Sequence, residues 1–484
     1  MASDGDRIST RAMTIAVVGA GPSGVIAAKY LRAEKVFEKI VLFEQRSRPG
    51  GIWIYTGEQR DENLFDVPQT NPNKDFQKPE WQPKEKVTNG DVNTNGADNA
   101  SKTPSFLSPI YETLETNIPR GLMSFQDLNW PSDSQLFPTH ETVLKYVEDY
   151  SADVQDLVQY CTQVTNVIPT DPTNPTSPWA VTTKNLLTNE SISEIYDAVI
   201  VANGHFIVPS IPSIPGIQDW AAQHPGRITH SKYYRRASDF ASKKVIVIGN
   251  SASGADISAQ IASACTLPLL WSTRSQSLFS TTHGAASADQ RRREVPPIAR
   301  FLPSTRGVEF ADGSQAHDID AIVFATGYFY SLPFLESVEP KLITTGEKRV
   351  IPFPIAEAQA AVLARVYAGR LDLPSIATMR AWEESVEEEM GAGRNFHLLN
   401  FPKDGKYINE MSAWAAQAEE KDGLEDGGKG KKPPVWGEWQ FWCREHFPKI
   451  RQAFGAKGEE RKEVRTLEEL GFVFEEDRVK EKDV

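Results

Sequence analysis

The chain has 484 residues, 40% of them hydrophobic, and a formal net charge of −13. This length predicts roughly two to four domains, and the composition allows a large core. The acidic balance argues against non-specific nucleic-acid binding, which requires a basic face. No apolar run approaches the ~20 residues that cross a bilayer, and residues 1–11 lack the apolar segment of a signal peptide. We therefore expect a cytoplasmic protein without a membrane span.

Three cysteines, Cys161, Cys265 and Cys443, lie far apart in the sequence. Because there is no CxxC pair, neither a dithiol redox centre nor a clustered cysteine metal site is expected. Free buried thiols are typical of a reducing compartment. The sequence therefore predicts no metal site and disfavours a pyridine-nucleotide disulfide reductase.

The N-terminal part of the chain has the pattern of a βαβ unit. Residues 13–18 form a short β-rich apolar run, residues 25–31 have helical spacing, and residues 39–44 form a second apolar run. A glycine-rich turn, residues 19–24, separates the first strand from the helix. This order is typical of a dinucleotide-binding unit.

Each glycine of the first turn has a predicted role. Gly19 allows the tight turn, Gly21 lets the backbone approach a pyrophosphate, and Gly24 lets the helix pack on the strand. The helix N-terminus supplies N–H groups and partial positive charge to the phosphates. Glu44 closes the next strand, where a carboxylate accepts hydrogen bonds from a ribose diol and repels a 2′-phosphate.

The middle of the chain alternates between irregular and regular segments. Residues 82–103 are rich in Asn, Gly, Lys and Asp, which predicts a flexible surface insertion. A helix capped by Thr139 is expected over 139–150, and strands over 180–183 and 196–202. Three closely spaced prolines then mark a connector suited to a domain crossing, namely Pro209, Pro212 and Pro215.

A second βαβ unit follows the connector. Strand 244–248 leads into the turn 249–254, a helix through Ala264 and a strand at 268–272, and an apolar run at 321–328 closes the unit. Ser251 stands where the middle glycine of the turn is expected, and its hydroxyl can donate to a phosphate.

The charged residue after this second unit is basic rather than acidic. Arg274, with Ser272 and Thr273 as further donors, is our candidate for a clamp on a 2′-phosphate. A plain structural turn and a surface arginine are the alternative interpretations. The two units together predict an α/β fold with two Rossmann-like dinucleotide-binding domains, the second inserted in the first.

The domain boundaries follow from this insertion. Residues 1–207 are expected to form the first part of one domain, residues 208–327 the inserted domain, and residues 328–484 the return to the first domain with a C-terminal helical region. Residues 356–367 are predicted to be a helix, and residues 419–434 a charged, glycine-rich loop.

At this point the chain resembles the flavin-containing monooxygenases, class B flavoproteins, and most of all those of fungal type. The resemblance spans about residues 12–390, and its motifs occur in family order at 19–24, 50–53, 111–119, 226–235, 249–256, 324–328 and 352–354. The family's identifying motif normally begins with Phe, and His224 stands in that place here. Gly226, His230 and Tyr234 are kept, and the motif does not match the Baeyer–Villiger variant.

The resemblance implies FAD and NADPH as cofactors, with FAD at Glu44 and NADPH at Arg274. Gly51, Ile52 and Trp53 then lie where backbone contact with the isoalloxazine, walled by the tryptophan, is expected. The predicted cofactor-binding set comprises Gly19, Gly21, Pro22, Ser23, Gly24, Glu44, Gly51, Ile52, Trp53, Thr116, Asn117, Gly249, Asn250, Ser251, Ser253, Gly254, Asp256, Ser272, Arg274, Thr326 and Gly327.

Asn117 matches the family's asparagine beside the flavin and is the predicted catalytic residue. A side-chain amide can donate to a peroxide oxygen without acting as a strong acid. The alternative interpretation is an Asx turn before Ile118 and Pro119. His230 has no metal-like partners nearby in the sequence and is expected to be structural.

The implied reaction uses NADPH, O2 and a small-molecule amine or sulfur substrate. Hydride transfer reduces FAD, oxygen adds to give a C4a-hydroperoxide, and a soft nucleophile takes the distal oxygen. The assembly is left open, with a homodimer among the options.

One departure from the family concerns the segment between Tyr328 and Pro352. About twenty residues are absent by comparison after Glu347, including a strand that packs near the flavin in relatives. A lineage deletion, a mispredicted splice junction and a variant with weak flavin binding are all compatible with this gap. Two further functions therefore stay open: an NADPH oxidase that releases hydrogen peroxide, and a catalytically weak FAD- or NADP-binding protein.

Overall fold

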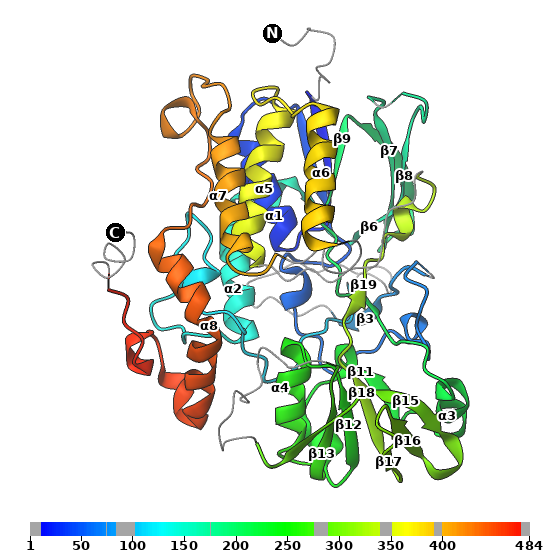
Figure 1. The fold of residues 1–484 in the computed structure, drawn as a ribbon. Coiled ribbons are helices and arrows are strands. Elements are labelled where there is room, and N and C mark those ends of the chain that lie inside the picture. The colour runs from blue at the N-terminus through cyan, green and yellow to red at the C-terminus, as the bar shows by residue number, and fades with distance from the viewer. Residues whose placement is uncertain are drawn as a thin grey trace, which may run out of the picture.

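A computed structural model of the chain describes residues 11–73, 75–83, 102–174, 176–274, 289–338, 351–391 and 399–475. The molecule has two lobes, each built on a parallel sheet with helices packed against it (Figure 1). The segment after Glu347 that differs from the family lies outside the described residues.

The first sheet has the strand order β5-β2-β1-β9. All of its strands are parallel: β1 (Thr14–Val18), β2 (Lys39–Phe43), β5 (Val158–Gln159) and β9 (Ala198–Val201). Their apolar runs suit strands with both faces covered. Helices α1 (Pro22–Ala33), α2 (His140–Ser151) and α5 (Pro352–Tyr367) share one core with this sheet. We call this sheet with its helices the first unit.

The second sheet has the order β11-β18-β12-β13-β14 and is also parallel. Its strands are β11 (Ile228–His230), β12 (Lys244–Ile248), β13 (Thr266–Ser272), β14 (Arg292–Val295) and β18 (Ala321–Phe324). Helices α3 (Ile217–Gln223) and α4 (Ala252–Ile261) and the antiparallel strands β15 (Ile298–Leu302), β16 (Gly307–Phe310) and β17 (Gln315–Ala316) complete the second unit.

Two short strands connect the units. They are β10 (Val208–Pro209) and β19 (Tyr328–Phe329), which pair antiparallel with Val208 opposite Phe329. In Figure 1, β19 lies between the two lobes. The second unit is therefore reached and left at one point of the fold.

Two smaller antiparallel sheets accompany the first unit. One contains β6 (Thr162–Pro169), β7 (Trp179–Asn185) and β8 (Ser191–Tyr196), and the other contains β3 (Glu80–Pro83) and β4 (Lys102–Ser105). The predicted insertion 82–103 therefore begins and ends in strand, which corrects the expectation at its two ends. Residues 84–101 lie outside the described part of the chain.

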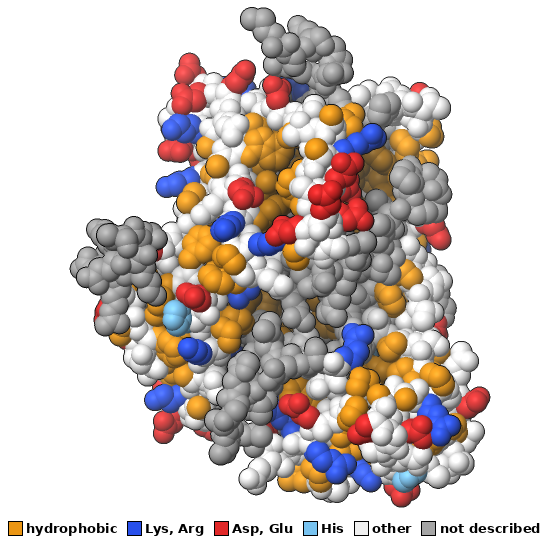
Figure 2. All heavy atoms as spheres, viewed as in Figure 1, with side chains coloured by type: hydrophobic (Ala, Val, Ile, Leu, Met, Phe, Trp, Pro, Cys, Tyr) orange, Lys and Arg blue, Asp and Glu red, His pale blue; other side chains and the backbone are white. Residues whose placement is uncertain are grey.

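Three further helices form the C-terminal part, namely α6 (Ile376–Met390), α7 (Lys403–Ala415) and α8 (Glu438–Ala456). Helix α7 packs on α5, and α8 buries Ile450 and Phe454 in a core with Phe137. Helix α6 has no buried residue, and Figure 2 shows acidic side chains gathered over it. No helix among the described residues is long and apolar enough to cross a membrane.

Most predicted elements are confirmed with small shifts at their ends. Strand 244–248 has the predicted bounds, while α4 ends at Ile261 rather than Ala264. Thr139 occupies the N-cap position of α2 as predicted, although its hydroxyl makes no capping hydrogen bond. The run 321–328 is divided into β18 and β19 by a turn at Gly327, whose φ is +83°.

Candidate functional site

The first glycine turn lies at the carboxyl end of β1 and leads into α1. Gly19 has a φ of +103°, and a Cβ there would lie 2.7 Å from the carbonyl oxygen of Ala202. A Cβ on Gly24 would lie 1.9 Å from the carbonyl oxygen of Gly19. Pro22 begins α1, and Ser23 in its first turn is exposed. Only glycine fits at Gly19 and Gly24, so the turn keeps free N–H groups at the helix N-terminus for an anion.

Glu44 and the two adjacent glycines Gly50 and Gly51 lie beside this turn. The Glu44 carboxylate is buried and accepts hydrogen bonds from Ala20 N at 2.8 Å and from Arg46 N at 2.8 Å. A Cβ on Gly51 would lie 3.0 Å from the Cα of Gly21. The structure therefore brings the predicted pyrophosphate turn, the ribose acid and the Gly50–Gly51 pair together.

Trp53, Thr116 and Asn117 occupy positions around the same unit. Trp53 is partly buried against its core, and the Ile52 carbonyl accepts a hydrogen bond from Ser108 Oγ. Thr116 is buried, and its hydroxyl donates to the Ile118 carbonyl at 2.8 Å. Asn117 is half-buried, and no other described residue forms a hydrogen bond with its side-chain amide. This amide is therefore available to a ligand, whereas the Thr116 hydroxyl is not.

The second glycine turn has the same geometry at the carboxyl end of β12. Gly249 has a φ of +113°, and a Cβ there would lie 2.3 Å from the carbonyl oxygen of Ala325. A Cβ on Gly254 would lie 2.1 Å from the carbonyl oxygen of Gly249. Ser251 is the N-cap of α4, and Ser253 in the first turn is exposed. The missing middle glycine has thus not altered the turn.

The predicted phosphate clamp lies just after β13. Ser272 is buried, and its hydroxyl donates to the Pro296 carbonyl at 2.9 Å. Arg274 is exposed and forms no ion pair or hydrogen bond with the rest of the described chain. Of Ser272 and Arg274, only the Arg274 guanidinium has no partner among the described residues and is available to donate to a ligand.

Two other predicted cofactor residues make contacts within the protein. The Asp256 carboxylate accepts hydrogen bonds from the Tyr111 hydroxyl and from Gln260 Nε2, the latter at 3.0 Å, and burial raises its pKa. The Thr326 hydroxyl donates to the Ser210 carbonyl. Asn250 is half-buried beside Gly249. The Asp256 carboxylate therefore bonds to Tyr111, from an earlier part of the chain, and the Thr326 hydroxyl bonds to the residue after β10, so both side chains already have partners within the protein.

A buried ion pair between Asp61 and Lys232 was not predicted from the sequence. Both side chains have 0% exposure, and Lys232 Nζ donates to the Asp61 carboxylate and to the Ile207 carbonyl. Burial lowers the pKa of the Lys232 ammonium, although the Asp61 carboxylate opposes this. Lys232 lies inside the motif 226–235, but Asp61 has no local sequence signal.

His230, in the same motif, is fully buried and caps the turn before Lys232. The Lys232 backbone N–H donates to His230 Nδ1 at 3.1 Å, and burial lowers the pKa of the imidazole to about 3. The ring is therefore neutral at physiological pH, which favours the expected structural role. No cluster of potential metal ligands is found in the described ranges.

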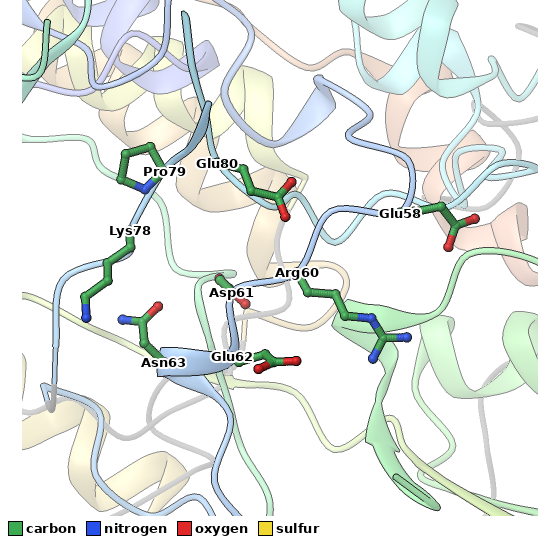
Figure 3. Close-up of a pocket in the computed structure, with 8 residues that line it drawn as sticks. All are labelled: Glu58, Arg60, Asp61, Glu62, Asn63, Lys78, Pro79 and Glu80. Atoms are coloured by element: carbon green, nitrogen blue, oxygen red, sulfur yellow. The ribbon is translucent and has the colours of Figure 1, made fainter. Parts of the chain in front are cut away.

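A cavity of about 510 Å³ adjoins Asp61. Its walls carry charges of both signs, with Glu58, Arg60, Asp61, Glu62, Asn63, Lys78, Pro79 and Glu80 around it (Figure 3). These residues come from 58–63 and from 78–80, just before and at the start of β3, and belong to neither glycine turn. The predicted site residues therefore do not line this cavity.

The sequence profile of the family described as "Flavin-binding monooxygenase-like" matches residues 100–284 and 302–361. The chain belongs to this family. A profile described as "NAD(P)-binding Rossmann-like domain" also matches residues 17–75. The predicted resemblance to flavin-containing monooxygenases, which rested on the sequence motifs, is thereby confirmed.

Curated relatives and a solved structure agree with this assignment. "Flavin-containing monooxygenase FMO GS-OX1" of Arabidopsis thaliana is 30% identical over 443 residues, covering 83% of this chain and 84% of the relative. The fungal "Flavin-containing monooxygenase iboF" of Amanita muscaria is 28% identical, covering 84% and 88%. The structure of S-allyl-L-cysteine S-oxygenase from Allium sativum matches with a TM-score of 0.67 and 25% identity, covering 96% and 98%.

Membership of the family settles the class of protein and its cofactors. The protein is a flavin-containing monooxygenase that uses FAD and NADPH. The α/β fold with Rossmann-like domains is likewise confirmed. The roles of single residues and the domain boundaries stay predictions.

Proposed function

We propose that the first unit binds FAD, that the second binds NADPH, and that the protein oxygenates a nucleophilic sulfur or nitrogen of a small molecule. The observation that carries this is the pairing of two glycine turns of equal geometry with charges of opposite sign. The first turn bonds to the buried Glu44 through Ala20 N. In the second turn, by contrast, Gly249 N donates to the carbonyl of Ser272, two residues before Arg274, which has no partner among the described residues. An acid suits a ribose diol, and a free guanidinium suits a 2′-phosphate.

The residues of the first unit fit FAD. Its turn leaves no room for a Cβ at Gly24, and the Gly51 backbone lies against the Gly21 backbone at the mouth of the same turn. When bound, the flavin supplies the redox and oxygen chemistry. The chain supplies anion binding at the α1 N-terminus, a wall at Trp53, and the half-buried Asn117 amide, which can donate a hydrogen bond to an oxygen atom.

Sulfur is the preferred reacting atom. The similar solved structure from Allium sativum, 98% of which is covered by the match, is named as an S-oxygenase of S-allyl-L-cysteine. A thioether or amine is a sufficient nucleophile by itself, so this reaction requires no strong protein base.

The test is to load the purified protein with FAD and measure NADPH consumption with thioethers and with tertiary amines. We expect sulfoxide formation coupled to NADPH consumption, with little hydrogen peroxide. In Asn117→Ala, oxygenated product per NADPH should fall by about tenfold or more while peroxide rises. NADPH consumption without product from any thioether or amine would contradict the proposal.

A specific observation favours a second candidate, an NADPH oxidase. Among the described residues β9 pairs only with β1, and Val201 at the end of β9 is 42% exposed. A site that admits water loses the protection that an oxygenating enzyme requires. In that case NADPH consumption matches hydrogen peroxide release with and without a thioether.

A further inference from the structure

Residues 57–73 and 75–77, which we call the strap, leave the first unit, cross to the second and return. At its start Gln59 exchanges hydrogen bonds with Ser105, at 2.7 and 2.6 Å. At its end Gln77 Nε2 donates to the Leu107 carbonyl at 3.0 Å. Both ends of the strap are therefore fixed to residues 105–107, at the end of β4 and directly after it.

The middle of the strap contacts the second unit. Phe65 and Val67 pack against its hydrophobic core, and the Phe65 ring lies 5.1 Å from the Tyr233 ring. Gln69 pairs antiparallel with Ile211: the Gln69 N–H donates at 3.0 Å and the Ile211 N–H at 3.3 Å. Ile211 lies two residues after β10, so the strap adds a strand-like contact directly beside the connection between the units.

Asp61 is the polar centre of this crossing. Its carboxylate accepts hydrogen bonds from Tyr233 Oη at 2.8 Å and from Gln77 Nε2 at 2.9 Å, and it pairs with Lys232. Lys232 in turn donates to the Ile207 carbonyl, at the start of the connection. One buried carboxylate thus joins both ends of the strap, the second unit and the connecting strand.

Arg235 makes a parallel set of bonds from the same motif. It is buried and donates to the Gly57 carbonyl, to Ser108 O at 3.2 Å and to Ile110 O at 3.2 Å. The residues that follow β11 therefore hold the first unit at several points. The two connecting strands alone would leave the units free to rotate, as is usual for domains joined by short linkers.

A buried ion pair contributes little net stability compared with an apolar pair of equal volume, but it defines one geometry. Its hydrogen bonds are directional. In any other orientation of the units the two charged groups would no longer pair with each other, and each would have to be exposed to water or stay buried at a cost. The position of the pair at the crossing indicates control of orientation rather than of overall stability.

We propose that the Asp61–Lys232 pair locks the second unit in one orientation against the first, and that both are positioning residues for hydride transfer from NADPH to FAD. The role in hydride transfer rests on the proposed function, which places FAD in the first unit and NADPH in the second. Hydride transfer depends steeply on the gap between the rings, and a misplacement of 1 Å can cost about 100-fold in rate.

The test compares Lys232→Met, Asp61→Asn and the double variant Asp61→Asn/Lys232→Met with wild type. The single variants leave a buried charge without its partner and can lose the fold. The double variant removes both charges at nearly constant volume, so it decides the question. Lys39→Met is the matched control, since it removes a lysine from the exposed pair with Glu194.

We expect the double variant to retain FAD and thermal stability, to bind NADPH within about threefold of wild type, and to reduce its flavin about 10- to 100-fold more slowly. Amide hydrogen exchange at Gln69 and Ile211 should accelerate, a readout that needs neither cofactor nor turnover. Lys39→Met should change none of these quantities.

Wild-type flavin reduction together with wild-type exchange at Gln69 and Ile211 in a folded double variant would overturn the lock. Loss of the fold in the double variant would also overturn it, because the pair would then serve folding instead of orientation. If NADPH reduces the flavin but no thioether or amine is oxygenated, the proposed function fails while the lock can still stand.

Discussion

At the scale of single residues, the two nucleotide sites differ most in the side chain that follows the glycine turn. Glu44 is buried and bonded to the backbone of its own turn, so its carboxylate is fixed in place. Arg274 is exposed and unpaired within the described chain, so it can rotate toward a ligand. The first is a rigid acceptor for hydroxyls, and the second a mobile partner for a dianion.

Arg274→Ala should remove the discrimination between NADPH and NADH. A charge-assisted hydrogen bond to a phosphate contributes about 1.5–3 kcal/mol, so kcat/KM for NADPH should fall roughly 10- to 100-fold while that for NADH changes little. Steady-state kinetics with both nucleotides measures this. Arg300→Ala is the control, because Arg300 is an exposed arginine of β15 that pairs with Glu309 of β16. An unchanged preference in Arg274→Ala would show that the clamp lies elsewhere.

At the scale of elements, the sequence predicted what local patterns determine. Apolar runs before the turns gave β1 and β12, and the glycines at 19, 24, 249 and 254 are required by contacts below 3 Å to a neighbouring carbonyl oxygen. Strands β6 and β8 were not predicted; in β8 only Tyr196 is buried, so no buried apolar run marks this strand in the sequence. The hydrogen-bond partners of side chains could not be predicted either. No local pattern indicates that Asp256 bonds to Tyr111, which is 145 residues away.

The two turns should respond independently to a methyl group. Gly24→Ala places a Cβ 1.9 Å from a backbone oxygen and Gly254→Ala one at 2.1 Å, so each turn must shift, at a cost of about 1–3 kcal/mol or more. We expect Gly24→Ala to lose FAD, and Gly254→Ala to keep FAD but to bind NADPH more weakly. Flavin absorbance after gel filtration and NADPH titration measure the two effects.

Gly455→Ala provides the matched control for this pair. Gly455 lies inside α8, and a Cβ there would meet no atom within 4 Å. Gly455 is in the last turn of the helix, so alanine there should raise the free energy of unfolding by at most about 0.5–1 kcal/mol without touching either cofactor. If Gly24→Ala behaved like Gly455→Ala, the first turn would not be the FAD site.

At the scale of the whole molecule, contacts distant in sequence hold the parts together. Asp61 and Lys232 are 171 residues apart, and Glu357 of α5 bonds to residues more than 200 positions earlier. Such contacts could not be predicted from spacing, because neither partner belongs to a local pattern. The second unit lies between β9 and α5 in the chain, in agreement with the order of the two βαβ patterns in the sequence.

Glu357 makes the stability of the whole chain depend on pH. It is fully buried, accepts hydrogen bonds from Tyr150 Oη at 3.0 Å and Gln126 N at 3.0 Å, and joins α5 to α2. Burial raises the pKa of this carboxyl from its ordinary 4.5 to about 7. Below about pH 4.5 the group is protonated in both folded and unfolded chains. As pH rises toward 7 the unfolded chain loses the proton first, so the free energy of unfolding falls.

Glu357→Gln should therefore stabilise the protein at pH 8 and leave its stability at pH 4.5 nearly unchanged. A shift of two to three pKa units corresponds to about 3 kcal/mol, which is the upper limit of the expected gain. Urea unfolding at pH values from 4.5 to 8 measures it, with Glu410→Gln on the exposed face of α7 as control. The wild-type curve should decline between pH 4.5 and 7 and then level off, while the variant curve stays above it from pH 6 upward. A variant that follows the wild-type curve at every pH would show that Glu357 is ionised in the folded chain throughout, held by its two hydrogen bonds and by Lys431.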